Sequence, residues 1–165
     1  MFNSLIRANW DSKLPIYELS HTKLLQQDIK CILLDVDGTI LSRNSKIIPD
    51  KVKEWIQISK KNFSLYLISN NPSEKRIAHI GRELGIKYIF KALKPSKKNT
   101  LKIINLFDEE NKNIAIIGDR IFTDILVGNR CKIKTILVKR LNKKGLPTKF
   151  NFTLTLEKII SYLIL

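Results

Sequence analysis

Short apolar runs alternate with amphipathic stretches from residue 31 to residue 138. The runs are rich in Ile, Leu and Val and lack the polar alternation of a strand with one solvated face, so they predict strands buried on both faces. Five such strands are predicted, at residues 31–34, 63–68, 87–90, 113–118 and 135–138. The first of them ends abruptly in two carboxylates, Asp35 and Asp37.

The stretches between these runs have the signals of helices. Pro49 and Asp50 open a helix whose residues Val52, Trp55, Ile56 and Ser59 share one face. Helices are also predicted for residues 73–84, closed by Gly85, for residues 95 to about 110, and for residues 124–130.

Strands that alternate with helices predict an α/β fold with right-handed crossovers and one doubly wound, Rossmann-like parallel sheet. We expect the strand order 3-2-1-4-5, with the first strand central and the switch point between strands one and four. The segments from Asp35 to Ser69 and from Ser69 to Lys94 have room for one helix and one strand each, so no cap domain is expected.

The two ends of the chain extend beyond this pattern. Residues 1–28 are predicted to be an appendage that packs on the core domain, residues 29–165, and four apolar residues near the start have near-helical spacing: Phe2, Leu5, Ile6 and Trp10. Near the other end, Leu156, Ile159, Ile160 and Leu163 form a stripe that indicates core packing. Two isolated cysteines, no secretory signal and no apolar run of membrane-spanning length predict a cytoplasmic protein with at most peripheral membrane contact.

The charge balance is far from neutral. Thirty Lys and Arg residues against 15 Asp and Glu residues give a net charge of +15 and a pI near 9.9. A polyanionic partner fits this excess, and nucleic acid, anionic lipid headgroups and phosphorylated substrates all remain open. A bias toward lysine in the composition is a further explanation.

Six polar residues follow four of the predicted strands and converge on one edge of the sheet. They are Asp35 and Asp37 after the first strand, Ser69 after the second, Lys94 after the third, and Asp119 with Asp124 after the fourth. Taken singly they have ordinary explanations: turns, helix caps or a surface lysine. Together they supply a nucleophile, a proton donor, oxyanion partners and oxygen ligands for a small cation, which are the requirements of phosphoryl transfer.

Four motifs occur in the order and spacing of the haloacid dehalogenase (HAD) superfamily of phosphatases. They are Asp-Val-Asp-Gly-Thr at 35–39, Ser-Asn-Asn at 69–71, Lys-Pro at 94–95 and Gly-Asp-Arg-Ile-Phe-Thr-Asp at 118–124. The chain resembles subclass IIIA of that superfamily and, within it, the bacterial and plastid YqeG group, which is related to mitochondrial phosphatases of phosphatidylglycerophosphate. A receiver domain shares the acid pair and the Lys-Pro, but its phospho-accepting aspartate follows a later strand.

The resemblance implies a role for each motif residue. Asp35 would form an aspartyl-phosphate, Asp37 would be the general acid and base, and Ser69 and Lys94 would bind the phosphoryl group. Mg²⁺ would be held by Asp35, the backbone carbonyl of Asp37 and Asp119. Supporting or substrate-contacting roles are expected for Thr39, Asn70, Asp124, Asn129 and Arg130.

The implied function is Mg²⁺-dependent hydrolysis of a phosphomonoester, with phosphatidylglycerophosphate as substrate and phosphatidylglycerol as product. An uncapped site favours large or surface-bound esters, which fits an anionic lipid at the inner face of a membrane or in the equivalent plastid compartment. Lys91, Lys97, Lys98 and Lys102 near the active edge would serve such a surface. Two alternatives stay open: a phosphatase for nucleic-acid ends, and a non-catalytic, basic nucleic-acid-binding protein on the same scaffold.

Overall fold

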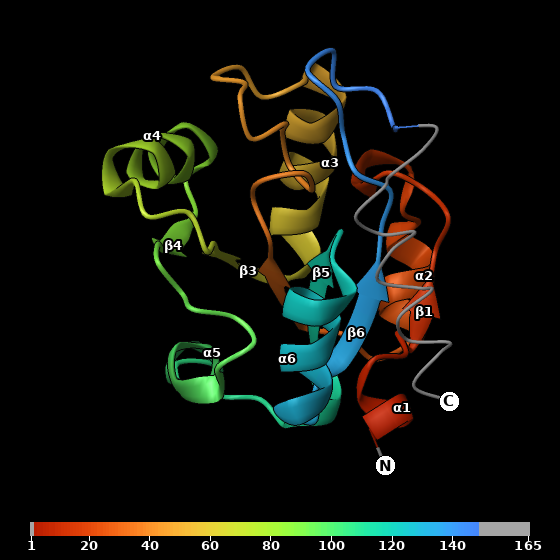
Figure 1. Cartoon of the computed structure of the whole chain (residues 1–165). Helices are drawn as coiled ribbons and strands as arrows, with labels where there is room; N and C mark the ends of the chain where they lie inside the picture. Colours follow the sequence, from red (N-terminus) through yellow and green to blue (C-terminus); the bar gives the residue numbers. More distant parts are fainter. Residues whose placement is uncertain (1, 149–165) are drawn as a thin grey trace.

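A six-stranded parallel sheet forms the centre of the molecule in the computed structural model, which describes residues 2–148 (Figure 1). Its order is β1-β6-β5-β2-β3-β4, so the predicted order is confirmed and one edge strand is added to it. The strands are β1 (Trp10–Asp11), β2 (Cys31–Leu34), β3 (Ser64–Ile68), β4 (Lys87–Ile89), β5 (Ile114–Gly118) and β6 (Lys134–Leu137).

Helices cover both faces of this sheet (Figure 1). The helices α3 (Asp50–Asn62) and α4 (Glu74–Leu84) lie on one face, and α5 (Lys97–Ile104) and α6 (Leu126–Arg130) lie on the other. Ile32 and Leu34 of β2 pack in the core cluster that includes α3 and α4, whereas Leu33 packs with α5 and α6. Both faces of β2 are therefore shielded from solvent, which explains its uninterrupted apolar sequence.

The ends of α3 and α4 follow the signals in the sequence. The buried residues of α3 are Val52, Trp55, Ile56 and Ser59, the face predicted for it. Ser73 caps the start of α4, since its side chain accepts a hydrogen bond from the backbone N–H of Arg76. Gly85 ends that helix with a left-handed φ of 64°.

The prediction that the next helix runs to about Glu110 is wrong. Helix α5 ends at Ile104 with Asn105 as its C-cap, and a short 3-10 helix, η2 (Asn111–Asn113), precedes β5. The acidic run 108–110 explains the early end, because carboxylates are unfavourable at the negative end of a helix dipole.

The N-terminal segment adds to the sheet. It contains α1 (Phe2–Leu5), β1, a 3-10 helix, η1 (Ile16–Glu18), and α2 (His21–Gln26). The near-helical spacing that reached Trp10 is misleading, because Trp10 pairs with Ile136 at the open edge of β6, a partner that no local pattern reveals.

The stripe between Leu156 and Leu163 lies outside the described residues. Among the described residues, no helix is long and apolar enough to cross a membrane.

Candidate active site

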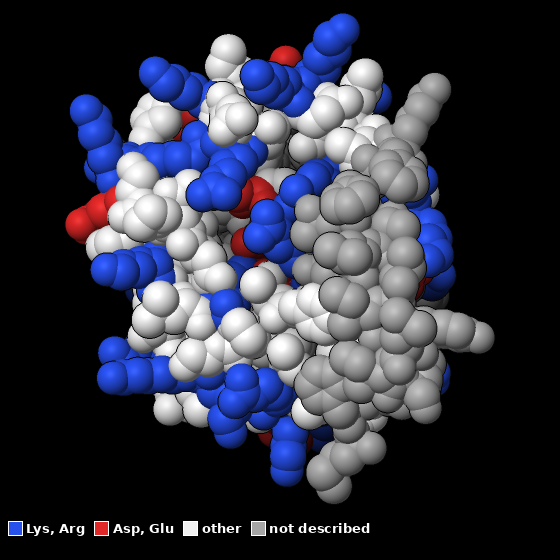
Figure 2. Space-filling model, in the orientation of Figure 1, with Lys and Arg blue, Asp and Glu red and all other residues white. Residues whose placement is uncertain are grey.

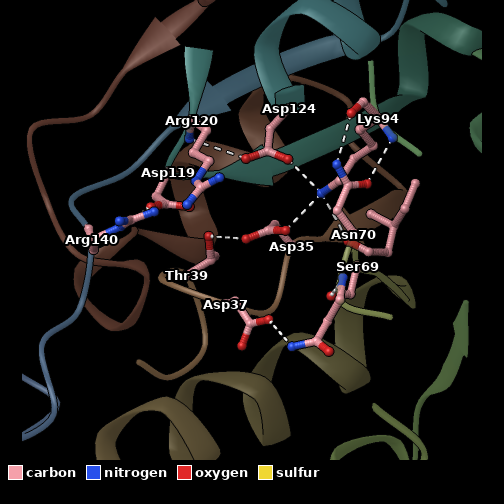
Figure 3. A network of polar contacts seen from close by, with 12 residues as sticks. Asp35, Asp37, Thr39, Ser69, Asn70, Lys94, Asp119, Arg120, Asp124 and Arg140 are labelled. Carbon is pink, nitrogen blue, oxygen red and sulfur yellow. Dashed lines mark hydrogen bonds and ion pairs between the residues drawn. The ribbon is translucent and has the colours of Figure 1, made fainter. Parts of the chain in front are cut away.

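The carboxyl ends of four adjacent strands, β5, β2, β3 and β4, bring the predicted site residues together (Figure 3). Strand β2 pairs with β3 on one side and with β5 on the other. Asp35, which follows β2, is therefore flanked by Ser69 after β3 and by Asp119 after β5. The topological switch point, where ligands gather in open α/β sheets, coincides with Asp35.

Lys94 is the cation at the centre of this site. Its Nζ lies 2.7 Å from Asp35 Oδ1 and 2.5 Å from Asp124 Oδ1, and it donates to the carbonyl oxygen of Ile68 at 3.0 Å. Burial disfavours the charged ammonium, but the carboxylates of Asp124 and Asp35 outweigh burial and raise the pKa of Lys94. Lys94 is thus held charged, against two carboxylates that it alone cannot fully neutralise.

The carboxylates of Asp35, Asp119 and Asp124 form a compact acidic cluster. One oxygen of each lies within 4.8 Å of the others, and all three residues are buried. Burial, followed by repulsion from Asp124, raises the pKa of Asp35 to about 6; burial, followed by repulsion from Asp35, raises the pKa of Asp119 to about 6. Burial is therefore the main reason why these two carboxyl groups hold their protons more tightly than free ones.

One acceptor of this cluster, Asp119 Oδ1, stands out within the part of the chain that the structure describes. Asp119 Oδ2 accepts from Arg140 Nε at 2.5 Å, but the buried Oδ1 has no hydrogen-bond partner among the described residues. Both oxygens of Asp124 are engaged, by Lys94 Nζ and by the backbone N–H of Arg120 at 3.2 Å. An orphaned carboxylate oxygen beside Asp35 suits a small, hard cation such as Mg²⁺, while Asp124 is suited to orient Lys94.

Two glycines permit this close packing of acids. Gly38 has a φ of +104°, and a Cβ there would lie 2.5 Å from Asp119 Oδ2. A Cβ on Gly118 would lie 2.3 Å from Asp124 Oδ2. A side chain at either position would force the neighbouring carboxylate of the acidic cluster to shift. A π-helical turn, η3 (Ile121–Ile125), then carries Asp124 back over the sheet edge.

Asp37 lies in the pocket in front of Asp35 and has its own cation. Asn71 Nδ2 donates to Asp37 Oδ2 at 2.7 Å, and Arg76 Nη2 lies 2.8 Å from Asp37 Oδ1. The same guanidinium donates to the backbone carbonyls of Ser42 and Ser45. Arg76 therefore ties the predicted acid and base to the loop that follows it, and neither Arg76 nor Asn71 was among the residues predicted from the sequence.

Loss of the contact between Arg76 and Asp37 should slow turnover, although the groups proposed to react remain in place. We expect Arg76→Gln to lower kcat by about 10- to 100-fold while KM changes little, because Asp37 then lacks the contact that orients it as a proton donor. Arg76→Lys should restore part of the rate, since an ammonium can reach Asp37 but cannot also hold both carbonyls. Steady-state kinetics on the three proteins measures this; a large KM effect with normal kcat would contradict the positioning role.

The remaining predicted residues divide between the site and its surroundings. Thr39 Oγ1 donates to Asp35 Oδ2 at 3.1 Å, and the Asn70 side chain bridges the backbone N–H and carbonyl of Lys94, each at 2.8 Å. Ser69 lines the pocket.

The structure does not bring Asn129 and Arg130 to the pocket. Asn129 Nδ2 donates to the carbonyls of Leu5 and Arg7 in the N-terminal segment, and Arg130 Nη1 donates to the carbonyl of Pro95. Their adjacency to the last motif in the sequence suggested substrate contact. Instead, α6 carries them away from the sheet edge, so the geometry gives them structural contacts.

The pocket itself is small and polar. Its volume is about 160 Å³, several times the share of one water molecule in the liquid, which is room for a phosphoryl group and a few waters. Besides the predicted residues, it is lined by Arg43, Asn71, Arg120 and Thr123. Asn71, Arg120 and Thr123 lie inside the quoted motifs, and that membership is the signal that could have indicated them. The loop that contributes Arg43 has no motif of its own.

Comparisons with known proteins agree with this geometry. The family model of the mitochondrial PGP phosphatases matches residues 8–140, a range that holds all the site residues described above. The chain belongs to the mitochondrial PGP phosphatase family. The predicted identity as a phosphatase of the HAD superfamily is thereby confirmed.

Two relatives and one solved structure illustrate how this family member compares. It is 30% identical over 137 residues to a Bacillus subtilis protein named "Probable phosphatase YqeG", covering 82% of this chain and 80% of that one. It is also 30% identical over 120 residues to the mitochondrial phosphatidylglycerophosphatase of Saccharomyces cerevisiae, covering 64% of each chain. The magnesium-bound HAD hydrolase YfnB of Bacillus subtilis has the same fold, with a TM-score of 0.53 and 14% identity over 73% of this chain and 90% of that one.

Proposed function

We propose that this phosphatase hydrolyses the terminal phosphomonoester of phosphatidylglycerophosphate and releases inorganic phosphate and phosphatidylglycerol. The observation that carries the proposal is the arrangement of Asp35. It follows the central strand, its carboxylate is bound by Lys94 and Thr39, and it lines a pocket of phosphoryl size together with Asp37. The substrate is the one that the name of the yeast relative states for that protein.

In the first chemical step, a carboxylate oxygen of Asp35 attacks phosphorus. The bond between phosphorus and the glycerol oxygen breaks, and Asp37 gives a proton to the departing alkoxide. In this proposal Lys94 and the Ser69 side chain, which both line the pocket, bind the oxygens of the phosphoryl group. The result is an aspartyl-phosphate and a free hydroxyl on phosphatidylglycerol.

In the second step, water attacks the phosphorus of this intermediate. Asp37, now ionised, accepts a proton from that water, the acyl phosphate bond to Asp35 breaks, and inorganic phosphate leaves. Asn71 and Arg76 hold Asp37 in place for both transfers. Because one carboxyl group alternates between acid and base, each cycle returns the site to its starting protonation.

Mg²⁺ is the proposed cofactor. Asp35, the backbone carbonyl of Asp37 and Asp119 would hold it, and Asp119 Oδ1, which has no hydrogen-bond partner within residues 2–148, supports this ligand set. When bound, the ion would neutralise charge on the phosphoryl oxygens and on the acidic cluster.

The openness of the site supports a large, surface-bound substrate. In the described structure, the segment from β2 to β3 contains α3 and its loops, and the segment from β3 to Lys94 contains α4 and β4; neither contains an inserted domain. Water exclusion must then come from the substrate or from the surface in which it lies. We therefore propose that the enzyme works on lipid at an anionic membrane surface.

The decisive experiment measures phosphate release in the presence of Mg²⁺. Phosphatidylglycerophosphate in vesicles with phosphatidylglycerol is compared with a 3′-phosphorylated oligonucleotide, and Asp35→Asn provides the blank. Turnover of the lipid alone supports the proposal. Turnover of the oligonucleotide alone would replace it with the nucleic-acid alternative, and salt-sensitive oligonucleotide binding with no turnover would favour a binding protein.

The ligand role of Asp119 predicts a pH-dependent stabilisation by metal. An acid whose pKa is raised in the folded state loses its contribution to stability as pH rises, so without metal the contributions of Asp35 and Asp119 fall between about pH 4 and pH 6. Mg²⁺ at about 100 times its Kd should restore about 2.7 kcal/mol at neutral pH and much less at about pH 5, where protons compete. Thermal melts with and without Mg²⁺ measure this. Asp119→Asn should remove most of the effect, and an equal shift in that variant would refute the ligand role.

A further inference from the structure

Two loops beside the active-site pocket expose large apolar side chains to solvent. Ile47 is 77% exposed and Leu146 is 52% exposed, although both belong to segments whose neighbours Ile48 and Leu141 are fully or almost fully buried. Single exposed apolar residues are common on soluble proteins, so exposure alone has no meaning. The exposure of Ile47 and Leu146 becomes informative when it is combined with the position, the charge and the internal hydrogen bonds of these two loops.

The loops lie next to each other at the carboxyl edge of the sheet. Loop 42–48 follows β2 and loop 141–147 follows β6, and both lie above that edge (Figure 1). The second loop packs against Pro49, the residue that directly follows the first loop, because a Cβ on Gly145 would lie 2.6 Å from the side chain of Pro49. Arg43, from the first loop, also lines the active-site pocket. The first loop therefore borders the pocket, and the second loop packs beside the end of the first.

This surface is positively charged throughout. The two loops contain four basic residues and no acidic ones; the basic residues are Arg43, Lys46, Lys143 and Lys144, all exposed. Figure 2 shows the wider setting, in which acidic atoms are visible in a hollow with Lys and Arg side chains around it. Cations around apolar tips match the two layers of an anionic bilayer, headgroup and acyl chain.

Both loops are held in shape by polar contacts, the first through Arg76 of α4 and the second through its own Asn142. Arg76 donates to the carbonyls of Ser42 and Ser45 in the first loop. Asn142 Oδ1 accepts from the backbone N–H groups of Lys144 and Leu146 in the second loop. Preformed loops pay little ordering entropy when they meet a surface, which favours binding by a small number of side chains.

We propose that loops 42–48 and 141–147 are the membrane-docking surface of the enzyme. Ile47 and Leu146 enter the boundary between headgroups and acyl chains, the four cations pair with anionic headgroups, and the pocket entrance comes to rest on the lipid surface. This inference rests on the proposed function, because it places the pocket where a lipid phosphomonoester protrudes. A nucleic acid would use the same cations but has no use for the apolar tips.

The test uses the full chain and vesicles of equal parts phosphatidylcholine and phosphatidylglycerol. The double variant Ile47→Asp with Leu146→Asp is compared with the wild type, and Leu106→Asp is the matched control. Leu106 is 69% exposed and lies near the amino ends of β3 and β4, on the opposite edge of the sheet. Three quantities are measured: vesicle co-sedimentation, turnover of phosphatidylglycerophosphate in the vesicles, and turnover of its deacylated, water-soluble headgroup.

We expect the double variant to lose at least about tenfold in vesicle affinity and to lose lipid turnover in parallel, because two apolar side chains no longer leave water. Turnover of the soluble headgroup should stay unchanged, and Leu106→Asp should behave as wild type in all three assays. As an independent readout, the emission of Ile47→Trp should shift to the blue when vesicles are added.

Several results would overturn this docking surface. Wild-type-like vesicle binding by the double variant is one, and equal loss in Leu106→Asp is another. Failure of the wild type to bind vesicles, with salt-sensitive oligonucleotide binding through Lys143 and Lys144, is a third. Failure of the proposed function looks different: neither the lipid nor the soluble headgroup is hydrolysed, while vesicle binding still reports on the two loops.

Discussion

Asp35→Asn should abolish phosphatase turnover while leaving the protein folded. The amide nitrogen and oxygen of asparagine occupy the space of the carboxylate but cannot form an aspartyl-phosphate. Loss of a covalent nucleophile typically costs about 10⁴- to 10⁶-fold in kcat. We expect the residual rate to lie in this range below wild type, and acid-quenched reactions with a radiolabelled substrate to show no phosphoenzyme.

The stability of this variant gives the prediction a second, independent readout. Burial raises the pKa of Asp35 to about 6, so the ionised carboxylate is unfavourable in the folded state at neutral pH. Its neutral replacement should leave the melting temperature without metal unchanged or higher. The exposed Asp108→Asn is the control and should keep full activity. Substantial turnover by Asp35→Asn would show that Asp35 is not the nucleophile. An unfolded Asp35→Asn protein would show that Asp35 has a structural role and would contradict the prediction that the fold is retained.

Lys94→Met should be the most destabilising single substitution in the site. It leaves Asp35 and Asp124 buried at the sheet edge without the ammonium that binds both of them. Breaking a buried ion pair in this way costs about 3–5 kcal/mol of folding free energy. Activity should be lost as well, because the phosphoryl group loses its cation.

The pH dependence separates this electrostatic cost from a simple packing defect. Without Lys94, the two carboxylates take up protons at a higher pH than before, so stability of the variant should rise as pH falls from neutral to about 5. Urea unfolding in a metal chelator at both pH values measures this, with the exposed Lys98→Met as control. A loss of stability that is the same at both pH values would point to packing and contradict the proposed charge balance.

Much of this fold can be predicted from local sequence. Val52, Trp55, Ile56 and Ser59 form the buried face of α3 as their spacing predicts, and Ser73 and Gly85 bound α4 as their capping chemistry predicts. Helix α5 shows the limit of periodicity. Its apolar spacing continues after Ile104, but a cap and an acidic run end the helix first.

The pairing of β1 at the edge of the sheet could not be predicted from local sequence. Strand β1 has two residues and no strand signal of its own, and it exists because β6 offers an open edge. The same applies to Asn129, which the motif pattern grouped with the substrate but which ties the N-terminal segment to α6. Contacts between residues more than a hundred positions apart leave no local trace.

The sequence by itself determined which polar residues follow the strands and so which ones are predicted to form the site. The motif acids, Ser69 and Lys94 could be named because each follows a recognisable strand, and parallel strands end on a common edge. Only the tertiary structure decided how those groups are paired. It assigned Lys94 to Asp35 and Asp124, Arg140 to Asp119, and Arg76 to Asp37. The physical reason is that strand ends follow from local hydrophobic patterning, whereas the partner of a charge depends on which distant loops fold back over it.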